Sequence, residues 1–388
     1  MNDLAAFRED ARSWLEANCP ERMRGPGPVA DAGTKMPARD PDARLWLDRC
    51  AERGWTVPLW PREYGGAGLD TRTYLVLLDE MRRIKARSPL AGMGVGLIGP
   101  TLIEHGTDEQ KARHLPRIAR GEVRWCQGYS EPGAGSDLAG LQTRAVARGD
   151  QYVINGQKIW TSGADKADWM FCLVRTDPDA PKHEGISLLL LDMDQPGVTT
   201  RPIRLISGDS PFCETFFDNA VARKDDLVGT LNRGWTVGKR LLQHERSGMQ
   251  VLVGGSVAAP SAVETMRDLL SRYGREPDHV ARLIKFDMRQ RAFRLTQRRT
   301  VAESDDGKTP GPQSSIFELC LAELEKEETD LKARMLGTQG LGWTGNGYTD
   351  EEIAFTRDWL SRKRRSIARG SNEIQMNIIA KRVLGLPD

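Results

Sequence analysis

The stretch WCQGYSEPGAGSDLAG, at residues 125–140, is the most informative part of the chain. Its glycines and its proline predict an irregular loop between two extended segments. The exposed backbone amides of such a loop, with the hydroxyl groups of Ser130 and Ser136, suit the carbonyl groups of a planar heterocycle or a phosphate group. An ordinary turn between strands is the alternative, and composition alone does not decide between the two.

Outward from this loop, the periodicity of the apolar residues changes twice along the chain. Residues 1–118 have a helical pattern, and Thr107 with Gln110 forms a predicted capping box. Between residues 119 and 230 the period is two, which predicts short strands at 169–174, 186–191 and 215–217. The pair Asn155-Gly156 between two apolar runs predicts a hairpin with a type I′ turn.

After residue 230 the helical period returns. One apolar stripe predicts a long helix, and residues 318–336 predict another; the stripe consists of Val280, Ile284, Met288, Ala292 and Leu295. Because helices and strands do not alternate, a doubly wound sheet is excluded. We predict an α+β fold that is mainly α, with an N-terminal helical domain (1–118), a central β-barrel or sandwich-like domain (119–230) and a C-terminal four-helix bundle (231–388).

Composition excludes several classes of function. The 388 residues carry 56 Lys plus Arg and 54 Asp plus Glu, and this balance gives no reason to expect nucleic acid as a partner. The six cysteines form no CxxC pair and the five histidines have no metal-ligand spacing, so we expect no metal site. The N-terminus is unlike a signal peptide and no apolar run could cross a membrane, so we predict a cytoplasmic protein without membrane insertion.

A GxGxxG match at residues 94–99 invites a dinucleotide-binding interpretation. That motif needs a strand before it and a helix opening at its end. Here a charged, helix-like stretch precedes the match and Pro100 follows it at once. We therefore expect these small residues to allow close helix packing.

The stretch at 130–137, SEPGAGSD, resembles the signature of the acyl-CoA dehydrogenase family, in which it lines a flavin and a thioester substrate. Further segments resemble the family in the same order along nearly the whole chain. They are GW at 54–55 with PREYGG at 61–66, NGQKIWTS at 155–162, GSNEIQ at 370–375 and IIAKRVLGLP at 378–387.

The resemblance implies non-covalently bound FAD. The backbone at Tyr129 and Ser130 would meet the pyrimidine edge of the flavin, the hydroxyl groups of Ser130 and Ser162 would lie near N5, and Trp160 would pack against the ring. Ser371 is a predicted helix N-cap that would face the ADP half. The implied cofactor-binding residues are Gln127, Tyr129, Ser130, Gly135, Ser136, Trp160, Thr161, Ser162, Arg272, Gly337, Ser371 and Glu373. The implied substrate-binding residues are Ser136, Arg246, Arg369 and Gly370.

The resemblance also implies α,β-dehydrogenation of an acyl-CoA thioester to the trans-2-enoyl-CoA, which requires a base for the α-proton. Many family members carry this base immediately before the closing Gly-Ser or Gly-Thr, where this chain has Arg369, a residue that cannot act as a base. A subset places it in a Glu-Arg pair on an earlier helix, which Glu245 and Arg246 match.

The helical stride supports Glu245 independently of the resemblance. A stride of three or four places it on one apolar stripe with Gly238, Leu242, Met249 and Leu252. A carboxylate on such a stripe is costly unless it is paired or functional. The alternative to catalysis is therefore a buried ion pair with Arg246 or Arg369.

The implied partners are an acyl-CoA substrate, an electron-transfer flavoprotein as electron acceptor, and further copies of the chain in a dimer or homotetramer formed by the C-terminal bundle. Two alternatives stay open. One is different flavin chemistry on the same fold, of the desulfinase or nitroalkane oxidase type, although a desulfinase needs no base at Glu245. The other is a half-site subunit of a hetero-oligomeric acyl-CoA dehydrogenase.

Overall fold

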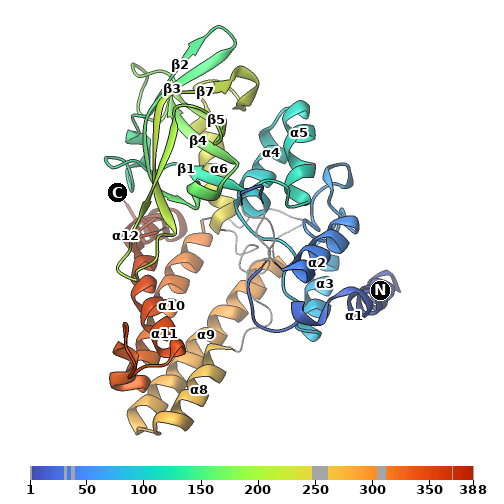
Figure 1. Cartoon of the computed structure of the whole chain (residues 1–388), viewed down its shortest axis with the longest axis vertical. Coiled ribbons are helices and arrows are strands. Elements are labelled where there is room, and N and C mark those ends of the chain that lie inside the picture. Colours follow the sequence, from blue (N-terminus) through green and yellow to red (C-terminus); the bar gives the residue numbers. More distant parts are fainter. Residues whose placement is uncertain are drawn as a thin grey trace. The chain divides into compact units, whose positions relative to one another are not determined.

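The computed structural model describes residues 2–29, 33–35, 40–246, 261–303, 312–368 and 370–387 (Figure 1). At Asn2, Glu245, Arg246, Arg298 and residues 301–303 only the backbone is described. The chain forms two compact units. The first comprises the described residues up to Ile203 and residues 211–245, and the second comprises residues 204–210, Arg246 and the described residues after 260. Each unit is described by itself below.

The first unit begins with helices, as predicted. They are α1 (Asn2–Asn18), α2 (Pro41–Glu52), α3 (Thr71–Arg83), α4 (Gly99–His105) and α5 (Asp108–Ala119). The predicted capping box at the start of α5 is confirmed, because Thr107 accepts from the Gln110 amide while Gln110 accepts from the Thr107 amide. Helices α1, α2 and α3 enclose a core around Leu15, Trp46 and Leu77.

Gly94 and Gly96 lie in a π-helical turn (Gly94–Ile98), and Gly99 is the first residue of α4. No strand precedes these glycines in the described part of the chain. A β-carbon at Gly99 would come within 2.2 Å of the Trp60 ring, and one at Gly94 within 3.1 Å of Ile118. The prediction of close packing is confirmed, because both positions admit only glycine without rearrangement.

A single sheet follows the helices. Its strands are β1 (Trp125–Gly128), β2 (Arg144–Arg148), β3 (Gln151–Ser162), β4 (Trp169–Arg175), β5 (Ile186–Asp192), β6 (Val198–Ile203), β7 (Phe212–Arg223) and β8 (Leu227–Val228). Their order is β6-β7-β3-β2-β4-β5-β8, and β1 pairs in parallel with β4. The predicted strands at 169–174 and 186–191 are confirmed as β4 and β5, and the strand predicted at 215–217 lies inside the longer β7.

The predicted hairpin at Asn155-Gly156 is wrong. Both residues lie inside the twelve-residue strand β3, at a bulge where its register with β7 shifts. Gly156 has φ +147°, and a β-carbon there would come within 2.7 Å of the Thr143 backbone. The glycine therefore serves a bulge and a close backbone approach. The two-residue hairpin turn lies earlier, at Gly149-Asp150, between the paired residues Arg148 and Gln151.

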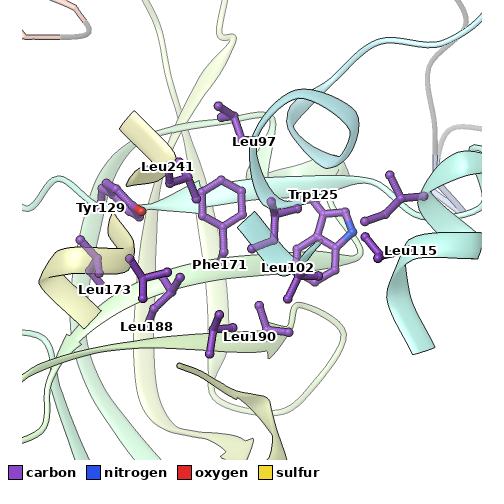
Figure 2. Close-up of a cluster of buried hydrophobic side chains, with 14 of the residues drawn as sticks. Leu97, Leu102, Leu115, Trp125, Tyr129, Phe171, Leu173, Leu188, Leu190 and Leu241 are labelled. Carbon is purple, nitrogen blue, oxygen red and sulfur yellow. The ribbon is translucent and has the colours of Figure 1, made fainter. Parts of the chain in front are cut away.

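Helix α6 (Gly234–Arg246), which belongs to the first unit up to Glu245, packs on the sheet. Figure 2 shows Leu241 of α6 beside Tyr129 and Phe171, in a cluster that continues to Leu102 of α4 and Leu115 of α5. The five residues from Met170 to Val174 on β4 are all fully buried. This sheet therefore completes its apolar core with helices of the same unit.

The second unit is helical. It contains α8 (Ala262–Tyr273), α9 (Pro277–Glu303), α10 (Ser314–Leu336), α11 (Asp350–Arg362) and α12 (Asn372–Ile378), which ends in a π-helical turn (Ile379–Val383). The helices from α8 to α11 run beside one another in Figure 1, and α10 contacts each of the others. The two long helices predicted from the sequence, α9 and α10, are confirmed.

Helix α9 buries a different face from the stripe that the sequence displays. Leu283 and Phe286 are buried against α8 and α10, with Phe293 partly buried beside them. Ile284, Met288 and Leu295, three members of the predicted stripe, are 57%, 66% and 64% exposed. The helix thus carries two apolar faces, and the described residues of its own unit cover only one of them.

No helix among the described residues is long and apolar enough to cross a membrane.

Candidate functional site

The loop at 129–136 is a short, tightly bonded turn on the sheet. Glu131 and Ala134 exchange two backbone hydrogen bonds of 2.9 and 3.0 Å, and the Ile159 amide donates to the Ser130 carbonyl at 2.9 Å. A β-carbon at Gly133 or Gly135 would meet nothing within 4 Å in the described structure. The loop is therefore fixed to β3 on one side and leaves open space at its glycines.

Trp160 stands beside this loop in an unusual conformation. It lies within the second register shift of β3, between Lys158 and Thr161, and has φ +60°. Its side chain is 53% exposed and meets Phe212 edge to face, with ring centroids 6.0 Å apart. A bulge re-aims side chains, and a positive φ in a bulky residue costs about 1–3 kcal/mol. A strained strand that presents an indole to the outside is a candidate surface for a planar ligand.

Two other predicted cofactor residues have unpaired polar atoms. Nε2 of Gln127 and Oγ1 of Thr161 are buried and have no hydrogen-bond partner among the described residues. Buried polar atoms without a partner are rare in native proteins, and a bound ligand is one common explanation. Ser130 and Ser162 are half-buried and Ser136 is exposed.

The end of α6 is held by an ionic cluster. Arg240 donates to both carboxylate oxygens of Glu104 on α4, at 2.6 and 2.7 Å, and His244 Nε2 lies 3.3 Å from the same carboxylate. Burial alone would raise the pKa of Glu104, but the hydrogen bonds and charges of Arg240 and the neighbouring histidines outweigh it and lower that pKa. The cluster fixes the last turn of the helix to α4.

Glu245 follows this cluster directly. Its backbone continues α6 one turn beyond the buried Leu241, on the same helix face. The side chains of Glu245 and Arg246 lie outside the described residues, as does the whole of Arg369. Their predicted roles as base and substrate-binding residues stay predictions.

The remaining predicted site residues belong to the second unit. Ser371 caps α12 by accepting from the Ile374 amide, as predicted, and the preceding Gly370 has φ +85°. Glu373 is exposed in the first turn of that helix. Gly337 ends α10 with φ +57°. The predicted N-cap at Ser371 is therefore confirmed, and the contacts of these residues with FAD and substrate stay predictions.

Arg272 has partners within the second unit. It forms an ion pair with Asp268 one turn earlier on α8, and its Nη1 lies 3.7 Å from Glu351. Its contact with FAD stays a prediction. To make that contact, the guanidinium would have to leave the carboxylates of Asp268 and Glu351 or bind FAD in addition to them.

Sequence reasoning missed one pair in the site, Glu131 and Lys158. Lys158 is fully buried and its Nζ donates to Glu131 at 2.8 Å and to the Tyr129 carbonyl at 3.0 Å. The signal was present, because a stride of two from the buried Tyr152 and Ile154 reaches Lys158. A lysine in a strand is ordinarily assigned to the exposed face, and for this reason the buried position of Lys158 was not predicted.

Comparison with known proteins identifies the family. Residues 2–122, 126–220 and 232–384 match the N-terminal, middle and C-terminal domains of acyl-CoA dehydrogenases. The chain is 39% identical over 393 residues to the acyl-CoA dehydrogenase IpdE1 of Mycobacterium tuberculosis, covering 100% of this chain and 99% of the relative.

Solved structures give the same result. The structure of the Tcur3481-Tcur3483 steroid ACAD matches with a TM-score of 0.77 and 29% identity, covering 100% of this chain and 98% of that chain. The ChsE4-ChsE5 complex from Mycobacterium tuberculosis matches with a TM-score of 0.75 and 28% identity, again covering 100% of this chain and 98% of that chain.

The chain therefore belongs to the acyl-CoA dehydrogenase family and is an oxidoreductase of that class. The predicted fold, with N-terminal helices, a central β domain and C-terminal helices, is confirmed. The boundaries at 118/119 and 230/231 stay predictions.

Proposed function

We propose that the chain catalyses FAD-dependent α,β-dehydrogenation of an acyl-CoA thioester to the trans-2-enoyl-CoA. The observation that carries this proposal is the outward-facing Trp160 on the bulged strand β3, next to the loop at 129–136. A strained backbone is kept where the surrounding structure enforces it, and such positions cluster at ligand sites. The family membership supplies the class of reaction.

The residues of the first unit fit a flavin. The exposed indole of Trp160 offers a face for the ring system, and the Gln127 amide, whose Nε2 has no partner among the described residues, offers a hydrogen bond to a polar edge. The open backbone at Gly133 and Gly135 leaves room for the phosphates or for substrate. The chemistry that FAD supplies when bound is acceptance of a hydride from the β-carbon of the substrate.

In this proposal the chain itself binds, orients and deprotonates the substrate. Glu245 removes the α-proton as the C=C bond forms, and the Arg369 amide donates to the thioester carbonyl as negative charge develops there. Arg246 organises the base or the CoA side. The Glu104–Arg240–His244 cluster supports the turn of α6 that carries Glu245.

For the substrate, we infer an acyl-CoA with a bulky, ring-bearing acyl group. The support is the similarity over the whole chain to a steroid ACAD. A base on the earlier helix, as proposed for Glu245, is compatible with branched, long or ring-bearing acyl groups. Electrons would pass to an electron-transfer flavoprotein. Anaerobic bleaching of the flavin by straight-chain, branched and steroid-bearing acyl-CoAs tests the substrate class, and we expect the last to bleach fastest.

We also propose that the C-terminal helices assemble the protein into an oligomer through the exposed face of α9. Ile284, Met288 and Leu295 form an apolar stripe on one side of that helix. Apolar stripes of this kind mark protein–protein contacts. The alternative of a half-site subunit is favoured by the two-chain names of the matching structures, Tcur3481-Tcur3483 and ChsE4-ChsE5. Purified protein that stays colourless after incubation with FAD, and turns yellow only with a second chain, would establish that alternative.

The decisive experiment on the base is Glu245→Gln. The amide keeps the size of the side chain but cannot take a proton, so we expect bound FAD with turnover lowered at least about a thousandfold, the upper part of the range for loss of a general base. Glu276→Gln, at an exposed carboxylate before α9, is the matched control and should leave turnover unchanged. Turnover of the Glu245 variant within a few-fold of the parent would show that the base lies elsewhere.

A further inference from the structure

Lys158 is the most unusual charge in the described structure. It lies on β3 with none of its surface exposed, and it is among the largest fully buried side chains. Taking an ammonium group out of water costs several kcal/mol unless it is paired and fully hydrogen-bonded. A buried ion pair adds little net stability compared with apolar residues of the same size, so stability alone gives no reason for a lysine here.

The partner carboxylate is fully occupied. Oε1 of Glu131 accepts from Lys158 and from the Thr143 amide at 2.9 Å, while Oε2 accepts from the Gln142 amide at 2.6 Å. Burial alone would raise the pKa of Glu131, but the charge of Lys158 and these hydrogen bonds outweigh it and lower that pKa. Glu131 is therefore a carboxylate at neutral pH, and it is anchored on the backbone that leads into β2.

The other contact of Lys158 is with the peptide group between Tyr129 and Ser130. Nζ donates to the Tyr129 carbonyl at 3.0 Å, and the next carbonyl, that of Ser130, accepts from the Ile159 amide. In a trans peptide the C=O and N–H groups point in opposite directions, and the described chain has no cis peptide. Fixing the Tyr129 carbonyl on Lys158 therefore directs the Ser130 N–H away from the buried lysine.

A charge on the carbonyl also changes the amide. A cation that binds the oxygen of a peptide group polarises it, and hydrogen bonds in such a chain strengthen one another in a low-dielectric interior. The Ser130 N–H is thereby a stronger donor than an ordinary backbone amide. Ser130 itself is half-buried, at the start of the open loop that contains Gly133 and Gly135.

We propose that Lys158 is a positioning residue that orients and polarises the Tyr129–Ser130 peptide, so that the Ser130 N–H binds the pyrimidine edge of FAD most strongly when the flavin is reduced. The proposal rests on the proposed function, because it requires FAD at this loop. The reduced flavin carries more negative charge at that edge than the oxidised flavin, so a polarised donor favours it. Lys158 acts through the peptide and does not touch the substrate.

The test uses two substitutions of Lys158 in the full-length protein. Lys158→Met removes both the hydrogen bond and the charge, and Lys158→Gln keeps a donor for the Tyr129 carbonyl without the charge. The measurements are the dissociation constant of oxidised FAD, the visible spectrum of the bound flavin and its reduction potential, and none of them depends on turnover. Glu80→Gln is the control, because Glu80 is a buried, ion-paired carboxylate in the separate core of the N-terminal helices.

The parent should bind reduced FAD more tightly than oxidised FAD, and we expect this ratio of affinities to fall at least tenfold in both Lys158 variants. A tenfold fall lowers the two-electron reduction potential of the bound flavin by about 30 mV. Lys158→Met should also bind oxidised FAD about tenfold more weakly, whereas Lys158→Gln should keep most of that affinity. The Glu80 control should unfold more easily without a change in potential. If Lys158→Met does not fold, Lys158→Gln decides alone.

Potentials and spectra equal to those of the parent in the folded Lys158 variants would overturn the proposal, leaving the lysine a purely structural role. Failure of the proposed function has a different signature. In that case the parent protein itself takes up no FAD under any reconstitution condition.

Discussion

Strand β3 and helix α9 depart from the usual placement of residues in opposite directions. β3 hides a charge, since Lys158 is fully buried, and α9 exposes apolar side chains, since Ile284, Met288 and Leu295 lie mostly in solvent. The charge on β3 is satisfied inside its own unit, by Glu131 and the Tyr129 carbonyl. The apolar stripe of α9 has no cover among the described residues of its own unit.

The difference separates a region that satisfies its unusual residue with its own contacts from a region that leaves its apolar stripe exposed. Departures from ordinary residue placement tend to occur at functional sites and contact surfaces. The β domain satisfies its unusual residue internally and thereby shapes a loop. The described residues of the C-terminal unit leave the apolar stripe of α9 exposed, and this is the face that we propose for a partner. Four changes test this comparison, in order of decreasing expected effect.

The largest effect is expected in the core of the β domain. Phe171 on β4 is fully buried and meets Tyr129 edge to face, with ring centroids 6.0 Å apart (Figure 2). Phe171→Ala leaves a large cavity and should lower the free energy of unfolding by about 3–5 kcal/mol, measured by urea denaturation. Ile284→Ala on α9 is the control and should cost less than about 0.5 kcal/mol at a concentration at which the protein is monomeric. Equal costs for the two would mean that α9 is not the open face.

The next effect concerns association through α9. Met288→Glu places a charge in the middle of the apolar stripe, and desolvating that charge opposes contact. We expect the dissociation constant of the oligomer to rise about thirtyfold, or about 2 kcal/mol, in sedimentation velocity. Lys285→Glu, one residue outside the stripe and exposed, also adds a negative charge and should have a much smaller effect. Unchanged association of the Met288 variant would assign the interface to another surface.

How much of this can be predicted from the sequence differs between the two regions. The strands β4 and β5 are located almost to the residue, because buried runs of apolar residues between turn signals favour a strand. For α9 the sequence predicts the helix, but the apolar stripe that indicates it is not the face that the helix buries. The helix carries one apolar row through Leu283 and Phe286 and another through Ile284 and Met288. Periodicity alone does not show which of the two rows is buried.

The site shows the same limit. The family motifs identify Trp160 and the loop at 129–136, but no motif shows that Trp160 has a positive φ or that Lys158 lies inside. The positive φ of Trp160 follows from the bulge of β3 between Lys158 and Thr161, which arises from pairing with β7, and pairing between distant segments is not visible locally. The burial of Lys158 fits the alternation of β3, but a strand lysine is ordinarily assigned to the exposed face. The side chains of Glu245 and Arg246 lie outside the described residues, so the assignment of the catalytic base is supported by the sequence alone.

A smaller effect on stability is expected at Glu80, whose ion pairs differ from the wholly buried pair of Lys158 and Glu131. Glu80 on α3 is buried, but its partners Arg8, Arg12 and Arg83 are about two-fifths exposed. Hydrogen bonds from Arg12 and the other two guanidinium groups lower the pKa of Glu80 from 4.5 to about 2. The stabilisation is therefore fully present above about pH 4.5 and is lost as the pH falls toward 2.

We expect Glu80→Gln to lower the free energy of unfolding at pH 7 by about 1–2 kcal/mol, because solvent screens the exposed arginines. The stability of the variant should also fall less steeply than that of the parent between about pH 5 and pH 2. Urea denaturation across that range measures both quantities. Parallel curves for parent and variant would show that Glu80 does not titrate as described.

The smallest effect tests what sets the register of β3. The strand starts at the turn Gly149-Asp150, where Gly149 has φ +58°. A β-carbon there would meet nothing within 4 Å in the described structure, so only the backbone conformation requires glycine. Gly149→Ala should cost about 1 kcal/mol in thermal or urea denaturation. Gly347, which also has open space but no positive φ, is the matched control and should tolerate alanine.

The same pair of variants links the turn to the buried lysine. A slip of one residue in the register of β3 would move Lys158 to the opposite face of the sheet. Because the turn at Gly149 fixes the first pairs of β3 with β2, we expect a small loss of flavin affinity in the Gly149 variant and none in the control. Equal stability of the two variants would mean that the bulge at Gly156, rather than the turn, holds the register that keeps Lys158 buried.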